Sequence, residues 1–244
     1  MPDTIDGKTV LIVGASSGIG AATAQMANGA GARTILVGRS EGPLATLAAS
    51  LPHPDRAIVR PADYLDPASL SAALEGSGPI DHVTISAVAD ENAKRGRIDA
   101  LSDAVMRASF DKFWGQVHTI RAALPHLSER ASITLFSSIA GFSPTGPEAG
   151  LSVMNGVQAA VMQTGRSLAR ELAPRRVNIV APGVVLTNVW TAEKRAELQT
   201  WMETAIPARH AGQPEDIAQA VLFLMTNPYV TGIVLPVDGG LSLQ

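Results

Sequence analysis

Near its start the chain has the sequence Val10-Leu11-Ile12-Val13-Gly14-Ala15-Ser16-Ser17-Gly18-Ile19-Gly20. Four apolar residues lead directly into a turn with three glycines, and the small residues 21–27 follow in a helical pattern. The apolar run is typical of a buried strand, and glycines permit a tight turn and a close approach of another backbone. A helix that begins after such a turn offers unpaired N–H groups and the positive end of its dipole to a phosphate. The stretch therefore predicts a nucleotide-binding strand, turn and helix, with a turn that binds nothing as the alternative.

Composition and charge exclude several classes of function. The 244 residues carry a net charge of −3, which argues against nucleic acid as the main partner because that function usually needs a basic patch. No window reaches the roughly 18 continuous apolar residues of a membrane span, so we expect no membrane partner. The absence of cysteine excludes disulfides and thiol nucleophiles and agrees with a cytoplasmic location. The five histidines are scattered without metal-ligand spacing, and we expect no metal site.

Strand-like runs alternate with helical patterns along the whole chain. Apolar, β-branched runs lie at 9–13, 34–37, 57–59, 82–85, 133–136, 177–180 and 233–235. Parallel strands need long crossover connections, usually helices, which then cover both faces of the sheet. No linker or change in composition divides the chain. The sequence therefore predicts an α/β fold, with a single domain over residues 1–244 built on a Rossmann-type, doubly wound sheet of about seven parallel strands.

The spacing of the glycine turn resembles that of one enzyme family. The pattern G-x-x-x-G-x-G, rather than G-x-G-x-x-G, is similar to the turn of the short-chain dehydrogenase/reductase family. In that family the turn holds the pyrophosphate of NAD or NADP. The resemblance implies that the cofactor is bound here by Gly14, Ser16, Ser17, Gly18, Ile19 and Gly20.

The end of the second predicted strand indicates which nicotinamide cofactor is used. An NAD site usually has an acidic residue here that accepts hydrogen bonds from the ribose 2′-hydroxyl, whereas an NADP site needs a cation for the 2′-phosphate. Gly38 occupies the position of the acid, and Arg39 follows it. The sequence thus favours NADP(H), with NAD(H) less favoured. The alternative is that Arg39 only points into solvent.

The resemblance implies further cofactor contacts after three other strands. Asp63 matches the aspartate that binds the adenine amino group in the family, and Tyr64 follows it. Ser86 and Ala87 lie where the family has Asn-Asn-Ala-Gly, with Val88 in place of the glycine. After the sixth strand the match is close, and it implies contacts to the nicotinamide, its carboxamide and the pyrophosphate from Pro182, Gly183, Val185 and Thr187.

The catalytic residues of the family are only partly retained. Ser138 matches the serine that orients the substrate carbonyl, but Leu151 and Asn155 stand where the family has Tyr-x-x-x-Lys. The tyrosine transfers a proton to or from the substrate oxygen, which Leu151 cannot do. Lys112 replaces an asparagine on the preceding helix, so the lysine and the asparagine have exchanged positions. We predict a catalytic set of Ser138, Lys112 and Asn155, in which Lys112 supplies the electrostatics, and the proton comes from Lys112, Ser138, water or the substrate itself. The alternative for Lys112 is a solvated helix lysine.

Two later segments suggest assembly and a cover for the site. The resemblance implies that the helix over 157–172 and the preceding long helix form a dimer face within a homotetramer, although both helices could simply pack on the sheet. Segment 188–211 carries Trp190, Trp201, Met202 and Ile206 among charged residues. This composition suits a substrate lid or an amphipathic helix packed on the body, and the two interpretations are compatible.

Three functions remain open at the level of sequence. The leading one is an NADP(H)-dependent oxidoreductase with an atypical active site and a small carbonyl or alcohol substrate. The second is a catalytically silent NADP(H)-binding homologue that acts as a sensor or partner subunit. The third is a different reaction on the same scaffold. Retention of the cofactor positions without the tyrosine and lysine favours the first two.

Overall fold

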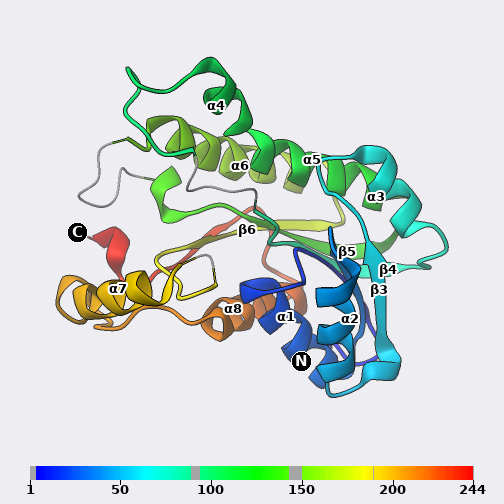
Figure 1. Cartoon of the computed structure of the whole chain (residues 1–244). Coiled ribbons are helices and arrows are strands. Elements are labelled where there is room, and N and C mark those ends of the chain that lie inside the picture. Colours follow the sequence, from blue (N-terminus) through cyan, green and yellow to red (C-terminus); the bar gives the residue numbers. More distant parts are fainter. Residues whose placement is uncertain (1–3, 89–93, 143–149, 189, 244) are drawn as a thin grey trace.

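The computed structural model describes residues 4–88, 94–142, 150–188 and 190–243. Within them, one parallel sheet has seven strands in the order β3-β2-β1-β4-β5-β6-β7 (Figure 1). The chain fills the sheet from the centre to one edge, returns to β4, and continues to the other edge. The strand order reverses between β1 and β4. The strands are β1 (Thr9–Val13), β2 (Arg33–Gly38), β3 (Ala57–Pro61), β4 (Ile80–Ile85), β5 (Leu127–Phe136), β6 (Arg176–Pro182) and β7 (Val234–Val237).

The predicted doubly wound fold is confirmed. The first six predicted runs lie inside observed strands, and only the seventh is displaced, from 233–235 to Val234–Val237. The displacement follows from register, because Val234 pairs with Ile179 and the ladder then continues until Val237 pairs with Pro182.

Alternating side chains of the strands supply two hydrophobic cores, one on each face of the sheet. In β1, Val10 and Ile12 enter one core, whereas Leu11 and Val13 enter the other, because successive strand residues point to opposite faces. Helices cover both faces of the sheet (Figure 1). One face is covered by α1 (Gly18–Gly29), α2 (Glu41–Ser50) and α8 (Pro214–Thr226), and the other by α3 (Pro67–Leu74), α5 (Asp111–Ala123) and α6 (Ser152–Glu171).

The remaining helical elements lie in the connections. Helix α4 (Asp103–Ala108) follows β4, and α7 (Ala192–Ala205) follows β6, so both belong to loops that leave the carboxyl ends of strands. Short 3-10 turns are η1 (Pro54–Arg56), η3 (Leu124–His126), η4 (Ile139–Gly141) and η5 (Leu241–Leu243).

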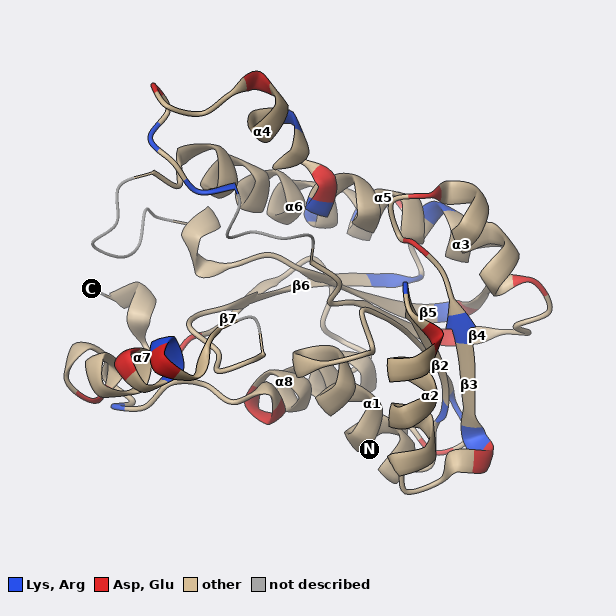
Figure 2. Cartoon of the chain, in the orientation of Figure 1, with Lys and Arg blue, Asp and Glu red and all other residues tan. Residues whose placement is uncertain are grey.

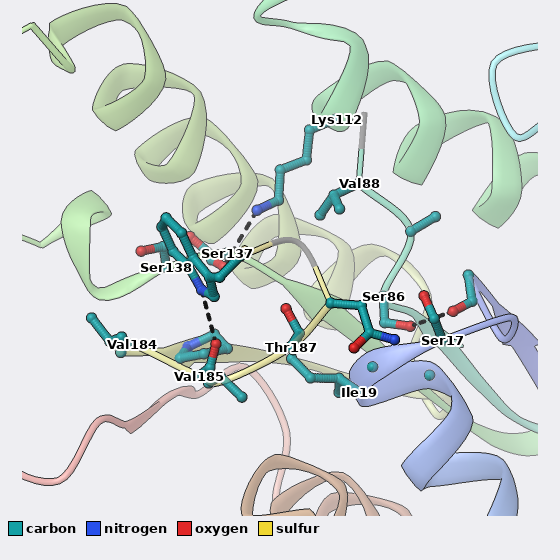
Figure 3. Close-up of a pocket in the computed structure, with 18 of the residues that line it drawn as sticks. Ser17, Ile19, Ser86, Val88, Lys112, Ser137, Ser138, Val184, Val185 and Thr187 are labelled. Carbon is teal, nitrogen blue, oxygen red and sulfur yellow. Dashed lines mark hydrogen bonds between the residues drawn. The ribbon is translucent and has the colours of Figure 1, made fainter. Parts of the chain in front are cut away.

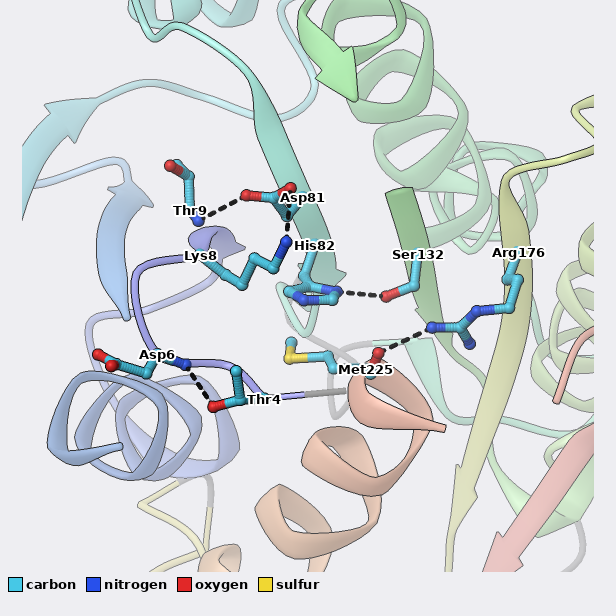
Figure 4. Close-up of polar contacts among 9 residues, drawn as sticks. All are labelled: Thr4, Asp6, Lys8, Thr9, Asp81, His82, Ser132, Arg176 and Met225. Atoms are coloured by element: carbon cyan, nitrogen blue, oxygen red, sulfur yellow. Dashed lines mark hydrogen bonds and ion pairs between the residues drawn. The ribbon is translucent and has the colours of Figure 1, made fainter. Parts of the chain in front are cut away.

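Polar contacts tie the elements together at the amino ends of the strands (Figure 4). The backbone N–H of Thr9 donates to Asp81 Oδ2 at 3.0 Å, which links β1 to β4. The buried pair His82 Nδ1 and Ser132 Oγ, 2.8 Å apart, links β4 to β5. These contacts stabilise the sheet at a distance from the carboxyl ends of the strands, so they do not occupy the end where ligands bind in such sheets.

None of the helices in the described ranges is both long and apolar enough to cross a lipid bilayer. The same ranges contain no group of three or more histidine, aspartate or glutamate side chains arranged to hold a metal ion.

Candidate functional site

A cavity of about 830 Å³ lies beyond the carboxyl ends of the strands (Figure 3). Open doubly wound sheets bind ligands in this place, where the strand order reverses. Of the predicted site residues, Asp63 and Asn155 are not among those that line the cavity. The structure does bring to its walls Gly14, Ser16, Ser17, Gly18, Ile19, Gly20, Arg39, Tyr64, Ser86, Ala87, Lys112, Ser138, Pro182, Gly183, Val185 and Thr187.

The glycine turn shapes one half of the cavity. Gly14 has a φ of +90°, in the left-handed region, and a Cβ there would overlap the backbone of Ala87. A Cβ at Gly20 would overlap the carbonyl group of Gly14. These two glycines allow α1 to begin directly against the end of β1, with its first turn in the cavity wall. The N-cap residue Ser17 makes no side-chain capping bond, so the first N–H groups of α1 are left for an anion.

The end of β2 adds a positive charge to this half. Gly38 and Arg39 both line the cavity, and Arg39 is exposed. Across the part of the chain that the structure describes, the Arg39 guanidinium makes no hydrogen bond or ion pair. Its charge is therefore directed to solvent and to whatever enters the cavity.

Asp63 and Tyr64, although adjacent, have different environments. The Asp63 carboxylate accepts the N–H of Leu65 at 2.9 Å, and this local turn holds it beside its own backbone. Tyr64 is 7% exposed and lines the cavity. Its ring packs against α5, where a Cβ at Gly115 would overlap it. The structure thus places the tyrosine, and not the aspartate, at this wall.

Lys112 extends from the first turn of α5 into the cavity and is 5% exposed. Its Nζ donates to the carbonyl oxygen of Ser137 at 3.5 Å (Figure 3). One turn later, the amide of Gln116 donates to the Phe136 carbonyl at 3.0 Å and accepts the Phe136 N–H at 2.9 Å. Because Gln116 fixes α5 to the end of β5, it also fixes where the Lys112 ammonium lies.

The two serines after β5 have different roles in the structure. Ser137 is buried, and its hydroxyl donates to the carbonyl of Gln158 on α6 at 2.9 Å. Ser138 is half-buried, and its Oγ accepts the N–H of Ala140 at 3.3 Å. In that bond Ser138 Oγ is only an acceptor, so its hydroxyl proton can be donated to a ligand in the cavity.

The start of α6 presents an apolar side chain to the cavity. Leu151, at the N-cap of α6, is one of the lining residues. Asn155 lies one turn later, is half-buried, and donates its backbone N–H to the Leu151 carbonyl at 2.8 Å. The cavity therefore combines the ammonium of Lys112 and the hydroxyl of Ser138 with the apolar side chain of Leu151.

An aspartate near the C-terminus supports the loop after β6. The Asp238 carboxylate accepts the N–H of Gly240 at 3.0 Å and that of Ser242 at 2.7 Å. Partial burial raises the pKa of Asp238, but hydrogen bonds, those of Ser242 foremost, outweigh burial and hold this pKa below its usual 3.8. A Cβ at Gly183 would lie 2.8 Å from the Asp238 Cβ, so the aspartate packs directly on this loop.

Comparison with known proteins identifies the family. The family model described as "Enoyl-(Acyl carrier protein) reductase" matches residues 14–242. The short-chain dehydrogenase/reductase malC of Malbranchea aurantiaca is 31% identical, over 99% of this chain and 97% of its own length. The chain belongs to the short-chain dehydrogenase/reductase family. Membership places it among oxidoreductases.

Two other relatives are informative about this short-chain dehydrogenase/reductase. The granaticin polyketide synthase putative ketoacyl reductase 2 of Streptomyces violaceoruber is 36% identical, over 99% of this chain and 98% of its own length. An NADPH-bound short-chain oxidoreductase from Pseudomonas aeruginosa PAO1, described as containing an atypical catalytic center, superposes with a TM-score of 0.87. That structure is 27% identical, with 98% of this chain and 99% of the other covered.

The outer wall of the cavity of this short-chain dehydrogenase/reductase includes residues that sequence reasoning missed. Arg95, Lys194, Glu197 and Leu198 all line it. Lys194 Nζ and Glu197 Oε2 are 3.1 Å apart on α7, a helix that carries both signs of charge (Figure 2). No local pattern marks these residues, because they reach the cavity through the tertiary arrangement of two connections.

Segment 188–211, apart from residue 189, which lies outside the described residues, contacts both the cavity and the core. Trp190 and Trp201 line the cavity. Met202 and Ile206 instead pack into the core, where they are 0% and 4% exposed. The segment thus packs on the body through one set of apolar residues and borders the cavity with another.

Proposed function

We propose that this chain is an NADP(H)-dependent oxidoreductase with an atypical active site that interconverts a small carbonyl compound and the corresponding alcohol. The observation that carries the proposal is the Lys112 ammonium, which is 5% exposed and lies in the cavity wall with Ser138. Burying a charged group costs desolvation free energy. Proteins typically bear this cost at functional sites, where the charge acts on a ligand. The similarity to the granaticin polyketide synthase putative ketoacyl reductase 2 of Streptomyces violaceoruber supports the same class of reaction.

The residues of the cavity fit the cofactor. The close backbone packing at Gly14 and Gly20 and the open first turn of α1 suit the pyrophosphate. Arg39 would bind the 2′-phosphate of NADP(H), whereas Gly38 offers no carboxylate to the ribose hydroxyl of NAD(H). The other residues that would hold the cofactor are Ser16, Ser17, Gly18, Ile19, Tyr64, Ser86, Ala87, Pro182, Gly183, Val185 and Thr187.

In this proposal Ser138 and Lys112 act on the carbonyl oxygen. When bound, the reduced nicotinamide supplies a hydride, with its electron pair, to the carbonyl carbon. The Ser138 hydroxyl donates a hydrogen bond that positions the oxygen. As the π electron pair moves onto that oxygen, the Lys112 ammonium stabilises the negative charge and transfers a proton to it, which gives the alcohol. Oxidation of the alcohol reverses each transfer. Leu151 helps to exclude water, and Asn155, which does not line the cavity, is assigned no proton transfer here.

A second candidate is a silent NADP(H)-binding homologue that serves as a sensor or partner subunit. The observation that favours it is Leu151, which gives the cavity an apolar side chain where the family has its proton donor. The two candidates share the cofactor and differ only in hydride transfer.

Titration and turnover of one variant separate the candidates. NADPH binding is measured by its fluorescence, and hydride transfer by loss of NADPH absorbance with a panel of ketones. We expect Lys112→Met to bind NADPH and to lose at least about 100-fold in kcat, the contribution typical of a general acid. Lys194→Met is the matched control, because Lys194 is a second lysine of the same cavity and is ion-paired with Glu197.

Each outcome has a clear consequence. Full turnover in Lys112→Met contradicts the role of Lys112. NADPH binding without turnover on any ketone favours the silent homologue. Absence of NADPH binding contradicts both candidates.

A further inference from the structure

The half of the cavity farthest from the glycine turn is mostly apolar. The strand order places the glycine turn and Arg39 on the β1–β3 side, whereas the loop after β6 and helix α7 border the other side. Apolar residues line this second side, and Trp201 is 36% exposed there. Exposed apolar side chains in a concave site indicate an apolar ligand. These apolar residues are Leu151, Val184, Trp190, Leu198 and Trp201.

The ring of Trp190 is held in a fixed orientation. Its Nε1 donates to the carbonyl of Val185 at 3.1 Å, and its backbone N–H donates to that of Thr187 at 3.3 Å. The guanidinium of Arg95 lies 5.7 Å from the ring centroid, in a cation–π contact. A ring fixed in this way loses little conformational entropy when a ligand packs against it.

Trp190 is also anchored next to the site of reaction. Val185, its hydrogen-bond acceptor, is one of the residues proposed to hold the nicotinamide. Arg95 comes from the opposite side, in the connection after β4. That connection is fixed to the segment before α6, because Gly96 donates its N–H to the Gly150 carbonyl at 2.9 Å. The indole therefore forms a rigid aromatic wall beside the place where a carbonyl group would be reduced.

The charges near this wall argue against other substrate classes. Lys112 disfavours a cationic substrate, because its ammonium lies in the same cavity. Lys194 and Glu197 bind each other at 3.1 Å, Arg95 lies over the indole, and Asn188 is a further polar residue of an otherwise mostly apolar wall. A sugar would leave its hydroxyl groups without enough polar partners here.

We infer that the substrate is a carbonyl compound with an aromatic ring attached to or near the carbonyl group, and that this ring packs against Trp190. This inference rests on the proposed function, and the reaction is the hydride and proton transfer given there. Aromatic pairs gain free energy beyond the area that they bury, which corresponds to a preference of about 2- to 10-fold for an aromatic over a saturated ring of similar size.

The test compares acetophenone with cyclohexyl methyl ketone, which differ in the ring and share the methyl ketone. Binding of each ketone to the NADP⁺-loaded protein is measured by calorimetry, so that the readout does not depend on turnover. We expect acetophenone to bind about 2- to 10-fold more tightly, and the kcat/KM ratio of the two ketones to fall by a similar factor in Trp190→Leu. Because each variant is judged by its ratio of kcat/KM values, the different intrinsic reactivity of the two ketones cancels between variants.

Two further variants keep the test decisive. Trp190→Phe retains a ring and loses the bond to Val185, and we expect it to keep most of the aromatic preference. Trp114→Leu is the matched control, because Trp114 is 51% exposed on α5 and does not line the cavity.

Three outcomes would overturn the inference. They are equal binding of the two ketones, absence of binding by either, or the same ratio of kcat/KM values in Trp190→Leu as in the native protein. Tight acetophenone binding without turnover would instead overturn the proposed function and leave the inference about binding standing.

Discussion

Arg39 is the residue on which the choice between two cofactors depends. NADPH and NADH differ by one phosphate, and Arg39 lines the cavity beside the turn proposed to bind the pyrophosphate. A charge-assisted hydrogen bond contributes about 1.5–3 kcal/mol, so Arg39→Ala is expected to weaken NADPH binding by roughly 10- to 100-fold. NADH binding should change little, because NADH has no phosphate for the guanidinium to bind.

Fluorescence titration of both cofactors measures this effect. Arg33→Ala is the control, since Arg33 is also exposed and lies at the other end of the same strand, β2. If Arg39→Ala binds NADPH as tightly as the Arg33 variant does, the guanidinium only faces solvent.

Single residues also mark where sequence reasoning stops. The resemblance predicted the positions of Lys112 and Ser138, and the structure places both at the cavity. Asp63 was also predicted at the site, but it does not line the cavity, and its carboxylate accepts the N–H of Leu65 at 2.9 Å in a local turn. Its contact with adenine stays a prediction. Asn155 differs for another reason, because one turn of α6 carries it past the part of the helix that borders the cavity.

Helix α7 illustrates the same limit for a whole element. Its sequence indicated an amphipathic segment, and the structure places Met202 in the core, fully buried. The pattern did not indicate that Leu198 and the Lys194–Glu197 pair would line the cavity. Those positions depend on where the long connection after β6 folds back. The role of this segment as a lid stays a prediction, as does assembly through α5 and α6.

Helix α8 depends on a buried arginine at its C-terminus. Arg176, at the start of β6, is 9% exposed and donates to the carbonyl groups of Leu224 at 2.7 Å, Met225 at 2.8 Å and Val230 at 3.0 Å (Figure 4). A cation at a helix C-terminus satisfies the last carbonyl groups and interacts favourably with the dipole. Arg176→Met would leave these acceptors without their donor, and we expect it to lower the free energy of unfolding by about 2–4 kcal/mol.

Urea-induced unfolding followed by circular dichroism measures that loss. Arg170→Met is the control, because Arg170 is exposed in the last turn of α6 and should change stability by less than about 0.5 kcal/mol. Equal midpoints for the two variants would show that α8 does not need this contact.

The architecture of the molecule was more accessible from the sequence than its substrate site. Each strand is a short apolar run whose alternate residues enter two cores. Such a run can be recognised from neighbouring residues in the sequence alone. The glycine turn is recognisable from its own spacing, G-x-x-x-G-x-G, although Gly14 packs against Ala87 after the end of β4. The far wall of the cavity joins Arg95 to Trp190, which are about two fifths of the chain length apart. Such a pairing leaves no periodic signal, so the wall around the glycine turn could be located from the sequence and the far wall could not.

The stability of the molecule in acid should depend in part on Asp238, which joins the C-terminal turn to the loop after β6. Hydrogen bonds from Ser242 and Gly240 outweigh partial burial and lower the pKa of Asp238 in the folded protein. A lowered folded pKa means that the unfolded chain binds the proton more readily, so this contribution is present above the unfolded pKa, near 4, and is lost as pH falls through the folded value. We expect the free energy of unfolding of Asp238→Asn to be about 1 kcal/mol lower than that of the native protein at pH 7, and the difference to shrink as the pH falls below about 4.

Urea unfolding of both proteins across this pH range measures the difference in the free energy of unfolding. Asp55→Asn is the control, because Asp55 is an exposed aspartate in η1. A difference that stays constant as the pH falls would show that the substitution acts through packing on Gly183 and not through the charge of the carboxylate.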